Sequence, residues 1–516
     1  MPRTTHTPGG GPAPLTGHDV FSSDRALAEG VARHAAGERA GELRAGLAAL
    51  GRAAGSAEVL EWGARAAARP PEPWDGGAGA DPSWHRLLDR AAAAGLTGAP
   101  PGPAARLRRT AALLVWAQVG TGQCPALSAA HAAAAGVRAD PDRNADPEHA
   151  AVREPAAGYG GGPRLPAGTV VPEGPDGVRA EPGSGGPEGA GYVLAGRGRL
   201  RPAAPADVLL VRAGTAGGES WFLMPWTLPD GARNGLRVRR PADGAGGPDP
   251  SAAVVEFDGT ARAWRIAAET TGALRADRVA CSAAVLRQAV VRAVHHAAHH
   301  GGPPGGEALT RNVLADLAVE SEAATALALR LAAAHDAGAD RDRALLRTAV
   351  PAAAYWLAGR CAPAAAEAWD LLGGDGCAGG PGIPPLPREA PDPAGESGGA
   401  LALEVLRVVR GDPEALTAFL TEIGRARGAD HRLDGAIREL LGELAELEGI
   451  EARARRLAER MVLVLQGALL VRHAPPEVAD AFCASRLGGE RGTAFGTLPP
   501  ALDLAAIVER ARPAAG

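Results

Sequence analysis

The residues with the clearest chemical potential lie in a glycine-rich segment in the last third of the chain. Residues 395–399 read Gly-Glu-Ser-Gly-Gly, so that a carboxylate (Glu396) and a hydroxyl (Ser397) come directly before a helical pattern starting near Ala400. The segment also fits G-x-S-x-G, the nucleophile elbow of α/β-hydrolases, which requires a buried strand before the serine. Residues 391–394, Pro-Asp-Pro-Ala, cannot pair in a central sheet. A serine nucleophile is therefore disfavoured, and Glu396 could serve simply as a helix cap.

A cluster of histidines is the second candidate for chemistry. His295, His296, His299 and His300 form two i, i+4 pairs on one predicted helix. That spacing can bring two imidazoles onto one metal ion. No accompanying glutamate or third ligand is evident, so we predict a solvent-facing helix end and no native metal site.

The composition excludes several classes of protein. All 54 basic residues are arginine, because the chain contains no lysine. Pyridoxal-phosphate enzymes and P-loop nucleotide hydrolases both require a lysine and are excluded. The net charge of -5 argues against a protein whose whole surface binds nucleic acid or anionic membrane, and leaves only a local basic patch.

Cysteines and hydropathy bear on the compartment. The five cysteines are scattered without a C-x-x-C motif, which is typical of reduced thiols. The first fifteen residues lack a charged start followed by an apolar core, and no later run is long and apolar enough to span a membrane. We expect a soluble, cytoplasmic protein without a membrane partner.

Periodicity predicts helices, then strands, then helices again. Residues 24–135 show helical spacing, whereas residues 156–263 contain short apolar runs separated by Gly, Pro and Asp turns. Long helical patterns return at 280–300, 308–337, 340–372 and 400–409, followed by three more segments up to Arg512. This order predicts an α+β, mostly α protein with a small antiparallel β domain. The expected domains are 1–155 (N-terminal helical), 156–265 (β barrel or sandwich), 266–412 (C-terminal helical bundle) and 413–516 (helical extension).

Motifs along nearly the whole chain resemble the acyl-CoA dehydrogenase superfamily and, within it, the alkylation-response (AidB-type) branch. They include Pro82-x-Trp84-His85, Cys124-Pro125, Leu228-Pro229-Asp230-Gly231-x-Arg233-Asn234, and Gly373-Gly374-x-Gly376 ahead of the Glu396 segment. The resemblance implies an acyl-CoA dehydrogenase-like fold, a homotetramer, FAD as cofactor and an acyl-CoA-like ligand.

The resemblance also assigns the site residues. Glu396 is the candidate base, which would take a proton from the substrate α-carbon while hydride leaves the β-carbon for the flavin. The FAD site would be formed by Gly168, Thr169, Arg199, Gly373, Gly374, Gly376 and Ser397. Arg407 and Arg486 match positions that contact double-stranded DNA in the family, and an arginine fork suits a phosphate.

Several departures from the family pattern fall at the expected cofactor site. An Arg, Arg199, stands where relatives carry a stacking Trp, and Pro202 replaces a Ser or Thr. The Arg-x-x-Phe-Gly motif that clamps the pyrophosphate is replaced by residues 300–303, His-Gly-Gly-Pro. We therefore expect an AidB-type protein, nominally a FAD-dependent oxidoreductase linked to the DNA alkylation response, with reduced catalysis. The alternative is a flavin-free pseudoenzyme that acts as a DNA-binding or scaffold protein.

Overall fold

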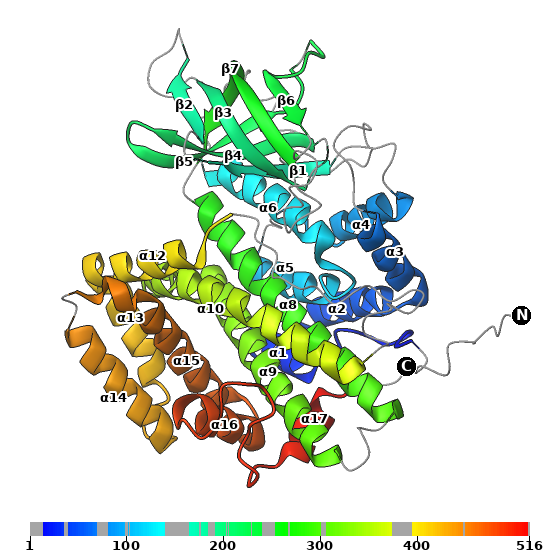
Figure 1. Cartoon of the computed structure of the whole chain (residues 1–516), viewed down its shortest axis with the longest axis vertical. Coiled ribbons are helices and arrows are strands. Elements are labelled where there is room, and N and C mark those ends of the chain that lie inside the picture. Colours follow the sequence, from blue (N-terminus) through cyan, green and yellow to red (C-terminus); the bar gives the residue numbers. More distant parts are fainter. Residues whose placement is uncertain are drawn as a thin grey trace, which may run out of the picture.

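The computed structural model contains a helical N-terminal part, a β barrel and a large C-terminal set of helices (Figure 1). It describes residues 14–35, 40–69, 81–98, 102, 104–139, 165–174, 177–183, 191–202, 204, 206–228, 230–239, 253–266, 269–300, 306–373, 395–446 and 449–513. Helix–strand–helix is the order that the periodicity predicts. The expected boundary at residue 155 lies outside the described residues, so the domain limits remain predictions.

The N-terminal helices are α1 (Arg25–His34), α2 (Ala40–Ala54), α3 (Ala57–Ala68), α4 (Pro82–Ala93), α5 (Ala105–Trp116) and α6 (Cys124–Ala139). Helix α6 is buried almost all round, because its run of alanines lets it lie directly against β1 and the first turns of α8. It carries one ionisable side chain in that run, His131, which is 1% exposed. This helix joins the β barrel to the helical body.

The β domain is a small barrel. Its strands are β1 (Leu165–Pro172), β2 (Val178–Pro182), β3 (Tyr192–Arg201), β4 (Ala206–Thr215), β5 (Gly218–Pro225), β6 (Leu236–Arg239) and β7 (Ala253–Arg265). Strands β1, β3, β7, β5 and β4 pair in a closed ring. The sheet is antiparallel except where β4 pairs in parallel with β1 and β2. The parallel pairing of β1 with β4, which no local pattern indicates, closes the ring.

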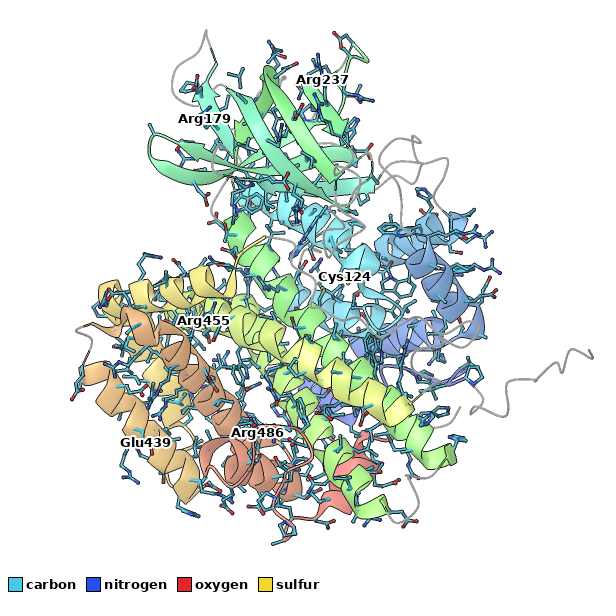
Figure 2. The ribbon with its side chains drawn as sticks, in the orientation of Figure 1. Cys124, Arg179, Arg237, Glu439, Arg455 and Arg486 are labelled. Carbon is cyan, nitrogen blue, oxygen red and sulfur yellow. The ribbon has the colours of Figure 1, made fainter. Side chains whose placement is uncertain are left out.

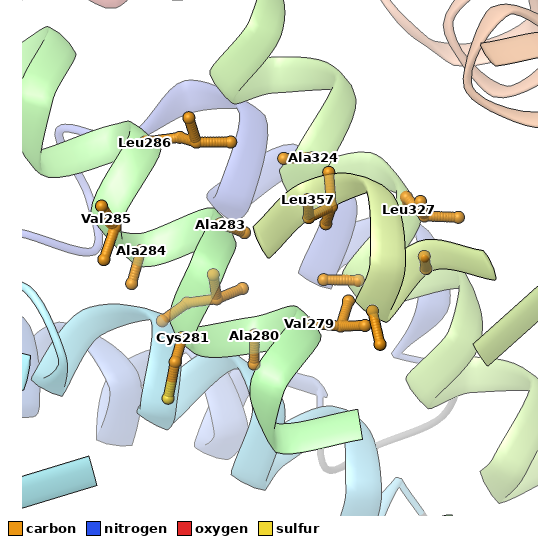
Figure 3. Packing of buried hydrophobic residues seen from close by; sticks show 14 of the residues in the cluster. Val279, Ala280, Cys281, Ala283, Ala284, Val285, Leu286, Ala324, Leu327 and Leu357 are labelled. Atoms are coloured by element: carbon orange, nitrogen blue, oxygen red, sulfur yellow. The ribbon is translucent and has the colours of Figure 1, made fainter. Parts of the chain in front are cut away.

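The C-terminal core is formed by the long helices α8 (Glu269–His300), α9 (Glu307–Ala337) and α10 (Asp340–Leu372), followed by α12 (Gly398–Gly411). Figure 3 shows how small side chains of α8, such as Ala280 and Ala283, pack with Leu327 of α9 and Leu357 of α10. Helix α8 starts eleven residues before the predicted Ala280, because the charged residues of its first turns are neutralised by partners on other elements. Local sequence could not show those partners.

Five further helices follow α12 in the described part of the chain, where the sequence predicted three segments. They are α13 (Pro413–Gly424), α14 (His431–Ala445), α15 (Ala454–His473), α16 (Pro476–Phe482) and α17 (Leu504–Ala511). Helix α15 is the buried member and packs against α9, α10 and α12, so the extension is continuous with the core. None of the described helices combines the length and apolar character that a membrane span requires.

Candidate active-site chamber

A large chamber lies among six helices, α5, α6, α8, α9, α10 and α12. Its volume is about 920 Å³, within the usual range for a small-molecule site. Apolar side chains cover much of the wall, among them Ala135, Ala273, Val279, Leu331, Leu346 and Val350. Charged and polar groups line the remainder, among them Arg106, Arg109, His131, Arg275, Asp277 and Glu404. The chamber therefore suits a ligand with an apolar body and charged ends.

The candidate base Glu396 lies beside the chamber and is held by α8. Its carboxylate accepts two hydrogen bonds from Arg275, from Nε to Oε2 at 2.8 Å and from Nη2 to Oε1 at 2.6 Å. Arg278 donates to the Glu396 carbonyl oxygen at 2.9 Å. The side chain of Glu396 is only 11% exposed. Glu396 is therefore a fixed, partly buried carboxylate, and Arg275, which lines the chamber, connects it to the cavity wall.

The loop that carries Glu396 lies directly against the β barrel. Gly395 has a φ of +61°, and a Cβ atom at this position would lie 2.7 Å from Val171 Cγ1 of β1. Only glycine fits such close contact in this backbone conformation. On the other side of Glu396, Ser397 Oγ accepts a hydrogen bond from Ala400 N at 3.1 Å and caps α12. The helix cap is thus the serine, and the alternative cap role of Glu396 is not what the structure shows.

A second carboxylate adjoins the same arginine. Glu404 Oε1 lies 4.0 Å from Arg275 Nη1, and Glu404 accepts two hydrogen bonds from Arg407. Burial alone would lower the pKa of Arg275, but Glu396 and Glu404 outweigh it and raise that pKa. The hydrogen bond from Arg407 lowers the pKa of Glu404. Both glutamates are therefore paired with arginines, and each Glu396 oxygen keeps a second lone pair beside its hydrogen bond from Arg275.

A buried polar network crosses three helices at the chamber wall. Arg109 of α5 forms a bidentate ion pair with Asp277 of α8, with Nη2 donating to Oδ2 at 2.9 Å and Nη1 donating to Oδ1. His131 of α6 contacts the same carboxylate through Nδ1 at 3.1 Å. Its other ring nitrogen, Nε2, contacts Arg106 Nη1 of α5. The side chains of Arg109, His131 and Asp277 are at most 4% exposed.

The protonation state of this network follows from its contacts. Burial, and then the charge of Arg109, lower the pKa of His131 to about 3, so the imidazole is neutral near pH 7. Burial would raise the pKa of Asp277, but Arg109 and His131 outweigh it and hold that pKa well below its ordinary value. Since Arg106 can only donate, Nε2 of His131 must accept and Nδ1 must carry the proton that points at Asp277.

Sequence reasoning did not find the network, whose hydrogen-bonded partners are up to 168 residues apart in the chain. The available signal was one histidine inside an alanine run, residues 129–135.

The β-domain residues that the resemblance assigns to FAD are occupied by protein contacts. A Cβ atom at Gly168 would lie 3.1 Å from Leu200 and 3.2 Å from Leu209, so this position packs inside the barrel. Thr169 is 2% exposed, and its hydroxyl donates to the Arg201 carbonyl oxygen at 3.3 Å. Arg199 forms an ion pair with Glu173 at 2.8 Å.

The remaining predicted FAD residues also have structural roles or cannot be described. Gly373 ends α10 with a φ of +57° and a ψ of -139°, a backbone conformation that favours glycine. Gly374 and Gly376 lie outside the described residues, and Ser397 caps α12. None of the described FAD candidates lines the chamber. The described candidates are thus engaged in protein contacts away from the chamber, and we derive no chemical step through that cofactor.

The two predicted DNA-contacting arginines differ in exposure. The Arg407 side chain is 71% exposed and pairs with Glu404. Arg486 lies among the C-terminal helices (Figure 2) with its side chain 1% exposed, paired with Asp316 at 2.5 Å and Glu320 at 3.0 Å. An arginine buried between two carboxylates cannot contact a phosphate, so the assignment of Arg486 to a DNA surface is corrected. The assignment came from a match to a family position, and such a match does not show whether the side chain is buried.

The predicted histidine pair lies at the end of α8. The rings of His295 and His299 are 4.4 Å apart, and His299 Nδ1 lies 2.8 Å from the His295 carbonyl oxygen. In the described part of the chain, no group of three or more His, Cys, Asp or Glu side chains is arranged to hold a metal ion. The side chain of His300 lies outside that part.

Comparison with known proteins gives two family matches and one curated relative. Residues 11–152 match the adaptive response protein AidB N-terminal domain, and residues 262–391 match the acyl-CoA dehydrogenase C-terminal domain. The putative acyl-CoA dehydrogenase AidB of Escherichia coli (strain K12) is 31% identical over 530 residues, covering 95% of each chain.

Solved structures share the fold at lower identity. Caenorhabditis elegans ACDH-11 in complex with C11-CoA has a TM-score of 0.75 at 21% identity, covering 93% of each chain. The apo form of Bd2924 has a TM-score of 0.70 at 20% identity, covering 89% of this chain and 99% of that one. An acyl-CoA dehydrogenase from Bacillus anthracis complexed with FAD has a TM-score of 0.55 at 14% identity, covering 83% of each.

Proposed function

This chain belongs to the AidB branch of the acyl-CoA dehydrogenase superfamily, and we propose that it binds an acyl-CoA-type thioester in the helical chamber. The observation that carries this proposal is a chamber of about 920 Å³ whose wall includes Arg275, the residue that holds the candidate base Glu396. The apolar side chains of the wall would cover the acyl chain, and the charged ones would meet its polar ends.

Glu396 is the group proposed to take the α-proton of the bound thioester. A carboxylate oxygen would accept the proton, and the electron pair of the C–H bond would remain on the substrate as the enolate of the thioester. Glu404 Oε1, 4.0 Å from Arg275 Nη1, is a second carboxylate partner for that arginine. The charge of Arg275 would then stay compensated when Glu396 becomes neutral.

Proton exchange tests this proposal without requiring a redox reaction. Octanoyl-CoA incubated with the protein in D2O should lose its α-hydrogen signal in NMR spectra, and Glu396→Gln should slow that loss about a hundredfold or more. Glu439→Gln is a matched control, because Glu439 is 67% exposed on α14 and does not line the chamber. No octanoyl-CoA binding in titration calorimetry would reject the chamber as an acyl thioester site. Equal exchange in the wild type and Glu396→Gln would reject only the base.

The second candidate is a flavin-free binding protein with the same fold. The acyl-CoA dehydrogenase family is FAD-binding. The observation in favour of a flavin-free protein is that Thr169 and Arg199 are engaged with protein partners and Gly168 is packed inside the barrel. Purified protein should then lack flavin absorption bands, and added FAD should leave its melting temperature unchanged, because a ligand specific to the folded state raises stability. Flavin bands at near-unit occupancy would reject this candidate.

A homotetramer, binding of double-stranded DNA and a role in the alkylation response remain proposals from the family resemblance. For DNA, the supporting observation is the exposure of Arg407 on α12. Arg407→Ala should weaken a salt-sensitive gel shift of duplex DNA, whereas Arg197→Ala, at a similarly exposed position on β3, should not. Equal shifts for both variants would reject Arg407 as a phosphate contact. Light scattering would report the number of subunits.

A further inference from the structure

One arginine of the chamber wall has a different kind of partner from three others. Arg275 pairs with Glu396, and two further wall arginines, Arg347 and Arg407, pair with Asp412 and Glu404. Arg106 of α5 instead contacts Nε2 of His131, which is a neutral imidazole. Its guanidinium is therefore oriented by a hydrogen bond that does not compensate its charge.

The orientation of Arg106 is built into the buried network. Arg109 fixes Asp277, Asp277 fixes the tautomer of His131, and His131 presents an acceptor to Arg106. The nearby carboxylate of Asp336 accepts hydrogen bonds from the backbone N–H groups of Arg106 and Leu107, at 2.9 and 2.8 Å. Burial and then the charge of Arg109 lower the pKa of Arg106, despite the opposite effects of Asp277 and Asp336. An anion that reached this guanidinium would offset those unfavourable effects.

Resting on the proposed function, we infer that Arg106 binds a carboxylate at the far end of the acyl chain. The chamber would then prefer thioesters of dicarboxylic acids over those of simple fatty acids. An arginine fork matches a carboxylate with two parallel hydrogen bonds, and the apolar wall would cover the methylene chain between the two ends. His131 does not contact the ligand in this arrangement and is a positioning residue.

Two thioesters of equal chain length test this inference. Suberyl-CoA and octanoyl-CoA both carry eight acyl carbons, and they differ in a terminal carboxylate against a methyl group. Titration calorimetry of the full chain should give suberyl-CoA about ten- to a hundredfold tighter binding, the factor that one charge-assisted hydrogen bond typically contributes. If octanoyl-CoA binds and suberyl-CoA binds no more tightly, the inference is overturned while the proposed function stands. If neither binds, both fail.

Variants test whether Arg106 causes the preference for suberyl-CoA over octanoyl-CoA. Arg106→Leu should bring the ratio of the suberyl-CoA and octanoyl-CoA affinities close to one, whereas Arg106→Lys should keep part of the preference for suberyl-CoA. Arg108→Leu is the matched control, because Arg108 is an exposed residue of the same helix and does not line the chamber. Equal weakening of both ligands by Arg106→Leu would contradict a carboxylate contact and indicate the CoA phosphates.

The positioning role of His131 has its own test. His131→Phe should lower the ratio by which suberyl-CoA binds more tightly than octanoyl-CoA, whereas His131→Gln, whose amide can both donate and accept, should retain most of that ratio. An unchanged advantage in His131→Phe would exclude the positioning role. The wild-type comparison of the two thioesters stands even if the Phe variant does not fold.

Discussion

The neutral state of His131 makes a quantitative prediction about stability and pH. In the unfolded chain this histidine has an ordinary pKa of 6.5, whereas burial and Arg109 lower its pKa to about 3 in the folded protein. Between these two values the unfolded state binds a proton that the folded state does not bind. The stabilising contribution is therefore complete above pH 6.5 and is lost as the pH falls toward 3.

The change in the free energy of unfolding between pH 7.5 and 5.0 depends mainly on the pKa of His131 in the unfolded chain. One pH unit of differential proton binding corresponds to about 1.36 kcal/mol, so proton uptake from pH 6.5 down to 5.0 destabilises the folded protein by about 2 kcal/mol. Arg109 and Arg106 face the imidazole and oppose its protonation, while Asp277 favours it. Any pKa of His131 below about 4 in the folded protein gives nearly the same loss of about 2 kcal/mol.

The assay is urea unfolding of the wild type and His131→Gln at the two pH values. The variant keeps an amide that can bond Asp277 and Arg106, but it removes the titration. Its free energy of unfolding should fall by about 2 kcal/mol less than that of the wild type between pH 7.5 and 5.0. His431→Gln is the control, since His431 is exposed at the start of α14, and it should behave like the wild type. Equal losses in the wild type and His131→Gln would refute a neutral, buried His131.

Two other substitutions should lower the free energy of unfolding. Asp277→Ala should lower the free energy of unfolding by about 3–5 kcal/mol, because it leaves Arg109 buried and unpaired. The double variant Arg109→Met, Asp277→Leu should lose much less. Equal losses for the two variants in urea unfolding would contradict this reasoning. Gly395→Ala should cost about 1–3 kcal/mol in thermal unfolding, through its φ of +61° and contact with Val171. Gly231→Ala, at a φ of +86° with open space around it, should cost less, and the same cost for both would show that the contact is unimportant.

The order of elements and the start of α12 were predictable from local patterns. Helical and strand spacings differ in period, and Ser397 directly precedes Gly398, where α12 begins. The first turns of α8 were missed because Arg275 and Asp277 interrupt the apolar pattern. Their partners, Glu396 and Arg109, lie 121 and 168 residues away in the chain. A local window cannot show that such charges are neutralised.

Arg486 illustrates the same limit for a site residue. In a chain whose only basic residues besides histidine are arginines, an arginine is expected at the surface, where it can contact an anion. Asp316 and Glu320, 170 and 166 residues earlier, instead neutralise it inside the helical core. The charge of an arginine predicts only that it has an anionic partner. Only the fold decides whether that partner is a phosphate outside or a carboxylate inside.

The start of α8 links the two chemical features of the chamber. Residues two apart on an α-helix point about 200° away from each other, so Arg275 and Asp277 reach opposite sides of the same turn. Arg275 holds the loop of Glu396, which lies against β1, while Asp277 holds the α5–α6 wall through Arg109 and His131. The position of the candidate base and the orientation of Arg106 are therefore both set by the same turn of α8.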